Sequence, residues 1–345
     1  MKEDFDKQPL IGMTLEGLRE VCLKVGAKPF AAKQMARWLY VARVTDIDAM
    51  TDLSKEVRAR LSEHYKIGRE EPFESMSSID GTIKYLFRGV GGRDVEAVYI
   101  PDRDRATLCV SSQAGCRMGC KFCMTGRFGL QGNLTPSQII NQILSCAHSE
   151  SLSNIVFMGM GEPTDNIDAV LQVIEILTAP WGMAWSPKRI TVSSIGRLPE
   201  LERFINETKV HIAISVHSPF SDQRGELMPS ERAWKLRDIF DILSRYDWSK
   251  QRRFSVEYIM WRGLNDDMRH ADALAKMVRP LSARVNLIRF HDIGDTSLKP
   301  CSLRTMEAFR DRLNDLGVTA TIRASRGEDI LAACGMLAGK NHKDI

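Results

Sequence analysis

The feature that most constrains this sequence is an alternation of short apolar runs and amphipathic segments from residue 105 onward. Six runs of strand length are expected, at 105–110, 154–158, 189–193, 210–216, 254–260 and 284–290. Helical spacing occurs near 166–178, 198–206, 231–245 and 266–278, and another helix is expected to begin at Thr135. Because buried strands that alternate with helices form parallel sheets, the pattern predicts six βα units. It therefore predicts an α/β fold, a partial (βα)6 TIM-like barrel, with its chemistry at the carboxyl ends of the strands.

Two shorter segments precede this region, so three domains are expected. Residues 1–66 have apolar residues at helical spacing, which predicts a small helical accessory domain. Residues 67–100 change to a period of two, with turns at Asp80-Gly81 and Gly91-Gly92, which predicts a β-hairpin linker. Residues 101–345 then form the barrel. The first domain is rich in Lys and Arg and is a candidate for holding phosphates, although such a run is also typical of an ordinary solvated face.

Three closely spaced cysteines follow the first expected strand as a C-x₃-C-x₂-C triplet: Cys116, Cys120 and Cys123. Thiolates ligate iron–sulfur clusters, and three of them leave one iron of a four-iron cluster without a protein ligand. A closed zinc site needs a fourth donor, and no Cys or His stands immediately beside the triplet. A zinc knuckle and three unrelated core cysteines are the alternatives. The metal-type spacing favours a site.

Composition limits where such a protein can work. The chain has 345 residues, 43% of them hydrophobic, which suits one large domain and a small one. Its start is charged without an apolar run, and no apolar stretch reaches the length of a membrane span. Eight cysteines without a secretory signal indicate reduced thiols, so a cytoplasmic location is expected. A net charge of +4 is compatible with nucleic acid without requiring it.

Glycine-rich and polar motifs follow several of the expected strands. The run Gly159-Met160-Gly161-Glu162-Pro163 follows the second strand, where its glycines allow close approach of a ligand and its carboxylate can accept from an ammonium group. Hydroxyl and imidazole groups end later strands and can hydrogen-bond a ribose or an adenine edge: Ser193, Ser215, His217 and His291. Each alone fits a strand-end cap or a core histidine. Together they favour a binding site.

Two cysteines outside the triplet stand in unusual surroundings. Cys109 ends the first expected strand, seven residues before Cys116. Cys334 lies near the carboxyl terminus among small residues, which indicates a mobile, accessible thiol. The other cysteines show no such context, and Cys146 is expected in the core.

Taken together, these motifs resemble those of the RlmN/Cfr family of radical-SAM RNA methyltransferases. The resemblance runs from about residue 26 to residue 340, and its first part, Lys28–Gln34, is similar to the start of the family's helical RNA-binding module. It is carried further by the run from Cys109 to Cys116, the triplet loop with Phe122, the Gly-Met-Gly-Glu-Pro turn, Ser215-Val216-His217, Val285–Ile288 and residues 326–335. RlmN-type members, which methylate carbon 2 of an adenine in 23S rRNA and some tRNAs, are the closer match.

The resemblance implies a role for each of these residues. The triplet is expected to hold one [4Fe-4S] cluster, whose open iron binds S-adenosylmethionine (SAM). The implied SAM contacts are Gly161, Glu162, Ser193, Ser215, Val216, His217 and His291; the last stands where many relatives have Asn. Cys334 is expected to carry a methyl group, Cys109 to resolve a protein–RNA link, and Glu96 to accept a proton. Met336 stands where many relatives have Gln, which changes a contact beside Cys334.

The implied reaction uses two SAM molecules, because carbon 2 of adenine is too electron-poor to attack a methyl group as a nucleophile. The first methylates Cys334, and one electron through the cluster converts the second to a 5′-deoxyadenosyl radical that takes a hydrogen from the S-methyl group. The resulting carbon radical adds to the base. After loss of the ring proton, attack of Cys109 on the Cys334 sulfur releases methyl-RNA and leaves a transient disulfide.

The same resemblance implies an electron donor such as flavodoxin or ferredoxin, no membrane partner and a monomer. Two alternatives are kept for the function. One is methylation of carbon 8, as in Cfr-type enzymes, which share these motifs. The other is a non-catalytic iron–sulfur or zinc RNA-binding protein, which would need neither Cys109 nor Cys334.

Overall fold

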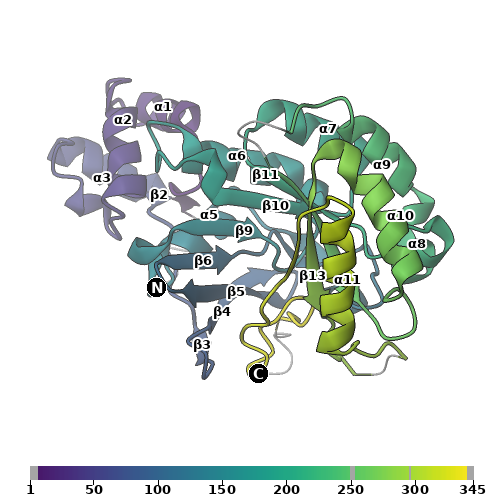
Figure 1. The fold of residues 1–345 in the computed structure, drawn as a ribbon. Helices are drawn as coiled ribbons and strands as arrows, with labels where there is room; N and C mark the ends of the chain where they lie inside the picture. Colours follow the sequence, from purple (N-terminus) through teal and green to yellow (C-terminus); the bar gives the residue numbers. More distant parts are fainter. Residues whose placement is uncertain (1–6, 249–252, 295–296, 340–345) are drawn as a thin grey trace.

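A mixed ten-stranded sheet organises the computed structural model, which describes residues 7–248, 253–294 and 297–339 (Figure 1). Its strand order is β14-β13-β12-β11-β10-β9-β6-β5-β4-β3. The parallel part consists of β6 (Arg105–Cys109), β9 (Asn154–Phe157), β10 (Ile190–Ser194), β11 (His211–Ser215), β12 (Phe254–Met260), β13 (Arg284–Arg289) and β14 (Ala320–Ile322). The antiparallel edge consists of β3 (Glu74–Ser77), β4 (Ile83–Val90) and β5 (Arg93–Asp102).

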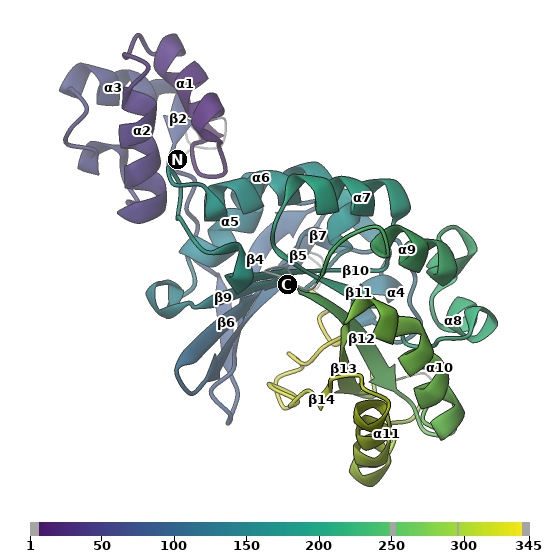
Figure 2. The same cartoon turned by 45° about the horizontal axis from the view of Figure 1, so that its top comes forward.

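Helices cover the outside of the parallel strands and form an arc around the curved sheet (Figure 2). Those of the barrel are α5 (Pro136–Leu144), α6 (Ile167–Thr178), α7 (Leu198–Glu207), α8 (Ser221–Leu227), α9 (Leu236–Leu243), α10 (Met268–Val278) and α11 (Leu303–Asp315). The short helix α4 (Met124–Arg127) follows the cysteine triplet directly. Two short strands, β7 (Gln113–Gly115) and β8 (Leu130–Asn133), pair antiparallel on either side of it.

The predicted α/β barrel is confirmed, and all six expected parallel strands end within one residue of their predicted limits. A seventh, β14, was not predicted, because its three residues are too few to show a periodicity. The helix expected over 231–245 begins only at Leu236. Both carboxylate oxygens of Glu231 accept the N–H of Leu236, at 3.2 and 3.1 Å, and residues 229–232 form a 3₁₀ turn instead. The capping box of Thr135 and Gln138 at the start of α5 is present as predicted.

The segment expected to be a linker continues the barrel sheet. Its strands β4 and β5 pair antiparallel, and β5 pairs with β6 so that Val98 lies opposite Cys109. The turns at Asp80-Gly81 and Gly91-Gly92 join these strands as predicted, with φ of +82°, +62° and +79° at the three glycines. The antiparallel strands therefore extend the barrel sheet beside β6, the strand that ends at Cys109.

The first helices, α1 (Leu15–Lys24), α2 (Ala31–Ala36) and α3 (Lys55–His64), gather at one end of the molecule (Figure 2). A short parallel pair, β1 (Gln8–Pro9) and β2 (Tyr65–Lys66), closes this group, and a π-helical turn over Arg37–Val41 continues α2. The group rests on the barrel through a hydrogen bond from Gln172 on α6 to the Gly12 carbonyl, at 2.6 Å. Within the described residues, no helix is both long enough and apolar enough to cross a membrane.

Candidate active site

A cavity of about 160 Å³ opens at the carboxyl ends of the parallel strands. Most of the predicted site residues line it: Cys116, Cys120, Cys123, Gly161, Glu162, Ser193, Ser215, His217 and Cys334. These residues come from five separate segments of the chain, so the fold gathers them. The barrel architecture predicts this position for chemistry, because the carboxyl ends of parallel strands meet at one edge.

The cysteine triplet forms one wall of this cavity. A hydrogen bond from Lys121 N–H to the Leu227 carbonyl (3.0 Å) ties its loop to α8. Burial raises the pKa of all three thiols, most of all that of Cys120, and the neighbouring thiols add to this rise. Among the described residues, no three Cys, His, Asp or Glu side chains converge on a point that one metal ion could occupy. Cysteines that each ligate a different iron do not need to converge in this way, so three soft donors on one cavity wall fit a four-iron cluster.

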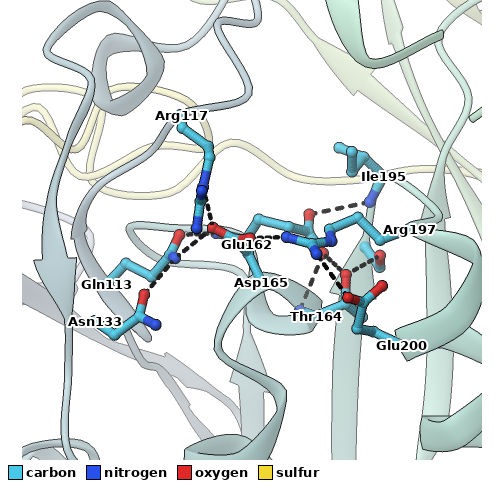
Figure 3. Close-up of polar contacts among 10 residues, drawn as sticks. Gln113, Arg117, Asn133, Glu162, Thr164, Asp165, Ile195, Arg197 and Glu200 are labelled. Atoms are coloured by element: carbon cyan, nitrogen blue, oxygen red, sulfur yellow. Dashed lines mark hydrogen bonds and ion pairs between the residues drawn. The ribbon is translucent and has the colours of Figure 1, made fainter. Parts of the chain in front are cut away.

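The glycine-rich turn after β9 is fixed by a buried network (Figure 3). The carboxylate of Glu162 accepts the N–H and hydroxyl of Thr164, at 3.2 and 2.5 Å, and the N–H of Ile195 at 3.1 Å. Burial raises the pKa of Glu162. At Gly161 φ is +96°, and an added Cβ would lie 2.5 Å from the Gln113 side chain, so only glycine fits. A ligand at this turn would therefore meet a preformed backbone.

An ion-pair group holds the same turn through residues that line neither cavity (Figure 3). The buried carboxylate of Asp165 accepts from Arg117 at 2.7 Å and from Gln113 at 2.9 Å, and it also pairs with Arg197. Arg197 in turn donates to Glu200 at 2.6 Å. Because Gln113 also accepts the Glu162 N–H at 2.8 Å, the two networks share one residue.

His217 lies just past β11 in a strained, buried position. Its φ of +58° is in the left-handed region. Its Nδ1 accepts the Ile259 N–H at 3.0 Å, and burial, with a smaller effect of the Arg224 charge, lowers its pKa to about 3. The ring is therefore neutral at physiological pH and carries its proton on Nε2, which makes it a donor toward a ligand. Val216 instead has its N–H bonded to the Glu257 carbonyl at 3.1 Å and does not line the cavity.

A second cavity, of about 90 Å³, contains Cys109. Cys123 and Cys334 line both cavities, together with the guanidinium-bearing residue Arg323. Burial raises the pKa of Cys109 to about 12, and the negative charge of a Cys334 thiolate adds a smaller increase. The positive charge of Arg323 acts in the opposite direction. Cys334 is exposed, in contrast to Cys109. The two outlying thiols therefore line the same small cavity, and Cys334 also lines the larger cavity that contains the triplet.

Sequence reasoning missed two arginines of this site. Arg323 follows β14 and pairs with Glu257 at 3.2 Å, and the charge of Glu257 raises its pKa. Arg224 is fully buried and donates to the carbonyls of Ile195 (3.1 Å) and Ser215 (3.0 Å), so it ties the ends of β10 and β11 together. Neither has a local signal in the sequence, because a charged residue on a short helix or after a short strand usually faces solvent.

Besides Val216, two other predicted site residues line neither cavity. Glu96 is buried, with Oε1 3.3 Å from the ammonium of Lys84 and Oε2 accepting the Ala338 N–H at 3.0 Å. His291 is also buried; its Nδ1 lies 3.2 Å from a Glu328 carboxylate oxygen and its Nε2 3.2 Å from the Ser325 hydroxyl. Both therefore face the C-terminal segment that carries Cys334. The SAM contact of His291 and the proton-acceptor role of Glu96 stay predictions.

Comparison with known proteins defines the class first. Residues 110–274 match the model of the family described as "Radical SAM superfamily". A crystal structure of a radical SAM methyltransferase from Sphaerobacter thermophilus is similar to this chain with a TM-score of 0.89 and 37% identity, over 96% of this chain and 99% of that one. The fold is thus that of a radical-SAM enzyme.

Further matches define the family. Residues 8–67 match the model described as "Ribosomal RNA large subunit methyltransferase N-terminal domain". A "Probable dual-specificity RNA methyltransferase RlmN" from Phocaeicola vulgatus is 55% identical over 96% of this chain and 95% of its own length. A "Dual-specificity RNA methyltransferase RlmN" from Syntrophotalea carbinolica is 40% identical over 96% of this chain and 90% of its own length. The chain belongs to the RlmN family of radical-SAM RNA methyltransferases.

Proposed function

We propose that this enzyme methylates carbon 2 of an adenine in 23S rRNA and in tRNA, through an S-methylated Cys334 and a transient protein–RNA link that Cys109 resolves. The observation that carries the proposal is the position of Cys334 on the wall shared by two cavities. One cavity contains the cysteine triplet, and the other contains Cys109. A thiol that receives a group on one side and gives it up on the other needs this arrangement.

The residues of the larger cavity have separate tasks in this proposal. Cys116, Cys120 and Cys123 hold a four-iron cluster. Gly161, Glu162, Ser193, Ser215 and His217 line the same cavity and would hold SAM, with the Nε2–H of His217 available as a donor. When bound, the cluster and two SAM molecules per turnover supply the methyl group and the one-electron chemistry that an electron-poor carbon requires.

The two outlying thiols then act as carrier and resolving group. Cys334 is exposed, so a base can reach it. Cys109 is buried and held as a neutral thiol by its surroundings, and it becomes a nucleophile only on losing its proton. Attack of its thiolate on the Cys334 sulfur would form the S–S bond and break the bond from Cys334 to the RNA-bound carbon, which keeps the bonding electron pair and takes up a proton to become the methyl group. The one electron left over from the radical addition would return to the one-electron carrier. Arg323 lines both cavities and places a positive charge beside each thiol.

The partners follow from the same proposal. RNA approaches the exposed Cys334 with its phosphates on the N-terminal helices. The electron comes from a small carrier such as flavodoxin or ferredoxin, and the enzyme works in the cytoplasm as a monomer.

Mass spectrometry of nucleosides tests the proposed product. Anaerobically reconstituted enzyme is incubated with methyl-labelled SAM, a reductant and 23S rRNA or tRNA, and the RNA is then digested. The label is expected in an adenosine methylated on carbon 2. Label on carbon 8 would identify the Cfr-type reaction, and absence of labelled RNA with cluster-loaded enzyme would favour a protein that only binds RNA.

Each cysteine of the triplet is expected to be essential. Replacing Cys116, Cys120 or Cys123 by Ala removes one of three ligands, so the visible absorption of the cluster and the cleavage of SAM should both be lost. Cys301→Ala is a matched control, because Cys301 is buried and lines neither cavity. Stoichiometric zinc and no iron uptake in anaerobically purified wild-type protein would contradict the assignment.

Basic residues of the N-terminal helices are expected to bind RNA phosphates. Lys24, Lys28 and Lys33 are exposed, whereas Arg58 and Arg60 pair with Asp48 and Glu56 inside the group. Changing the three lysines to Glu should weaken RNA binding and reduce the slope of log affinity against log salt by roughly 2 to 3, since each phosphate contact contributes about 0.7 to 0.9. SAM cleavage without RNA should stay normal. Binding and salt slope equal to those of a Lys276→Glu control on α10 would contradict this assignment.

A further inference from the structure

The segment that carries Cys334 has little order of its own. Residues 324–339, called here the Cys334 segment, form no helix or strand, and Gly327, Gly335 and Gly339 in it have positive φ. Such backbone has many alternatives when free, so contacts with its surroundings must fix it. The contacts come largely from the antiparallel edge of the sheet, from its β3–β4 turn through β5. Asp80 accepts the Gly327 N–H at 3.0 Å, and Arg93 donates to the Ala338 carbonyl at 2.8 Å.

Two buried, opposite charges lie beneath this segment. Lys84 on β4 and Glu96 on β5 each expose about 5% of their surface. Their charged groups lie 3.3 Å apart. In the strand register Lys84 lies opposite Val98, so Lys84 and Glu96 project to the same face as Val98, which lines the cavity of Cys109. The pair thus lies on the face of the sheet that the Cys334 segment covers.

The pair holds the backbone on both sides of Cys334. The Lys84 ammonium donates to the carbonyl of Leu331, three residues before Cys334, at 3.4 Å. The Glu96 carboxylate accepts the N–H of Ala338, four residues after it, at 3.0 Å. Between these anchors, the Gly335 carbonyl accepts the N–H of Met124, the residue after the cluster cysteine Cys123, at 2.8 Å. The three bonds together set where the Cys334 sulfur stands relative to the triplet.

We infer that Lys84 and Glu96 act together as positioning residues, which hold Cys334 where it can receive the methyl group. This inference rests on the proposed function, because it concerns the placement of the proposed methyl carrier. A displacement of about 1 Å at a reacting centre can cost roughly a hundredfold in rate, so two anchors beside one sulfur have a direct effect on catalysis. The role differs from the proton-acceptor role predicted for Glu96 alone, since it needs Lys84 equally and acts before RNA binds.

A double variant distinguishes the positioning role from the proton-acceptor role, because only a positioning pair should regain function when both charges are removed. Removing one charge leaves the other buried without its partner, whereas removing both together is often tolerated. Lys84→Met and Glu96→Gln should therefore each be impaired, and the double variant should regain much of the lost function. In the double variant the amide oxygen introduced by Glu96→Gln can still accept the Ala338 N–H. A proton acceptor lost at position 96 cannot be restored by a second change at Lys84.

The test measures transfer of the methyl group to Cys334 without RNA. Anaerobically reconstituted wild type, Lys84→Met, Glu96→Gln and the double variant are incubated with trideuteromethyl-SAM, and the tryptic peptide that contains Cys334 is followed by mass spectrometry. Amide hydrogen exchange over residues 327–339 is recorded in parallel. Arg88→Met is the matched control, because Arg88 pairs with Asp94 across the same two strands at 3.2 Å and its side chain is half-exposed.

The inference predicts that both single variants methylate Cys334 roughly ten- to a hundredfold more slowly. They should keep normal iron content and uncoupled SAM cleavage, and their Cys334 segment should exchange faster. The double variant should methylate Cys334 faster than either single variant, although it lacks the bond to Leu331, and Arg88→Met should lie close to wild type. Normal Cys334 methylation in Lys84→Met, or loss of RNA product in Glu96→Gln with normal Cys334 methylation, would overturn it; the latter is the result of a proton acceptor. Wild type that does not methylate Cys334 at all would instead reject the proposed function.

Discussion

Replacing Cys334 by Ala is expected to abolish methylation of RNA completely while leaving the rest of the site intact. The change removes the only proposed methyl carrier, and loss of a covalent catalytic group lowers turnover by more than about 10³-fold. The side chain is exposed, so its loss should hardly affect folding. Iron content, SAM binding and RNA affinity are expected to remain close to those of the wild type.

The measurement follows label from methyl-labelled SAM into protein and RNA separately. In wild type the label should appear in Cys334 and then in adenine. In Cys334→Ala it should appear in neither, although reductive SAM cleavage continues. Labelled RNA from Cys334→Ala would contradict the whole route through a thioether, and with it the main reason for assigning Cys109 a role.

Replacing Cys109 by Ala is expected to have a different result: RNA should become trapped on the enzyme. The carrier and the cluster ligands are unchanged, so methylation of Cys334 and addition to the base should still occur. Without the resolving thiol, the bond between Cys334 and the RNA-bound carbon persists. We expect up to one RNA per enzyme in a band that survives denaturant and disappears with ribonuclease.

The structural reason for this difference is the shared wall of the two cavities. Cys109 lies in the smaller cavity, beside Cys334 and away from the cavity expected to hold SAM. A purely structural Cys109 would give only a stability loss of about 1 kcal/mol on truncation to Ala, with no adduct. Cys146→Ala is the control for this, because Cys146 is a buried cysteine outside both cavities. Multiple turnovers by Cys109→Ala would contradict the proposal that Cys109 resolves the protein–RNA link.

Much of the fold could be predicted because regular strands and helices leave a periodic pattern of apolar residues within a short stretch of sequence. The strand at Phe254–Met260 was predicted to the residue, since its apolar residues begin directly after Arg252-Arg253. The short strand β14 and the helix α11 were not predicted. Only Met306, Phe309 and Leu313 of α11 are buried. Most of its other residues are polar, so the sequence shows only a weak apolar periodicity there.

Site residues that belong to a contiguous sequence motif could be predicted. Site residues that are placed only by contacts with distant parts of the chain could not. The triplet and the Gly-Met-Gly-Glu-Pro turn are contiguous motifs, and they line one cavity. Arg323, Arg224 and Lys84 are buried or half-buried by residues far away in the sequence, such as Glu257, 66 positions before Arg323. No local pattern separates such a residue from one on the surface, because the pairing that stabilises it exists only in the folded chain.

The pairing of the hairpin with the C-terminal segment is of the same kind. Period-two alternation predicted β4 and β5, but alternation does not show which strand or segment will lie beside them. Glu96 and Ala338 are 242 positions apart and are joined by one hydrogen bond. Contacts of this separation depend on the folded sheet and the path of the C-terminal segment across it, so they become visible only in the structure.

Tandem mass spectrometry of the adduct formed by Cys109→Ala tests the central claim most directly. The variant is allowed to react with methyl-labelled SAM and RNA, and the product is then digested with trypsin and nuclease. We predict that the peptide containing Cys334 carries an adenosine joined from carbon 2 to the sulfur through one labelled carbon. Labelled methyladenosine in the RNA together with an unmodified Cys334 peptide would contradict the claim.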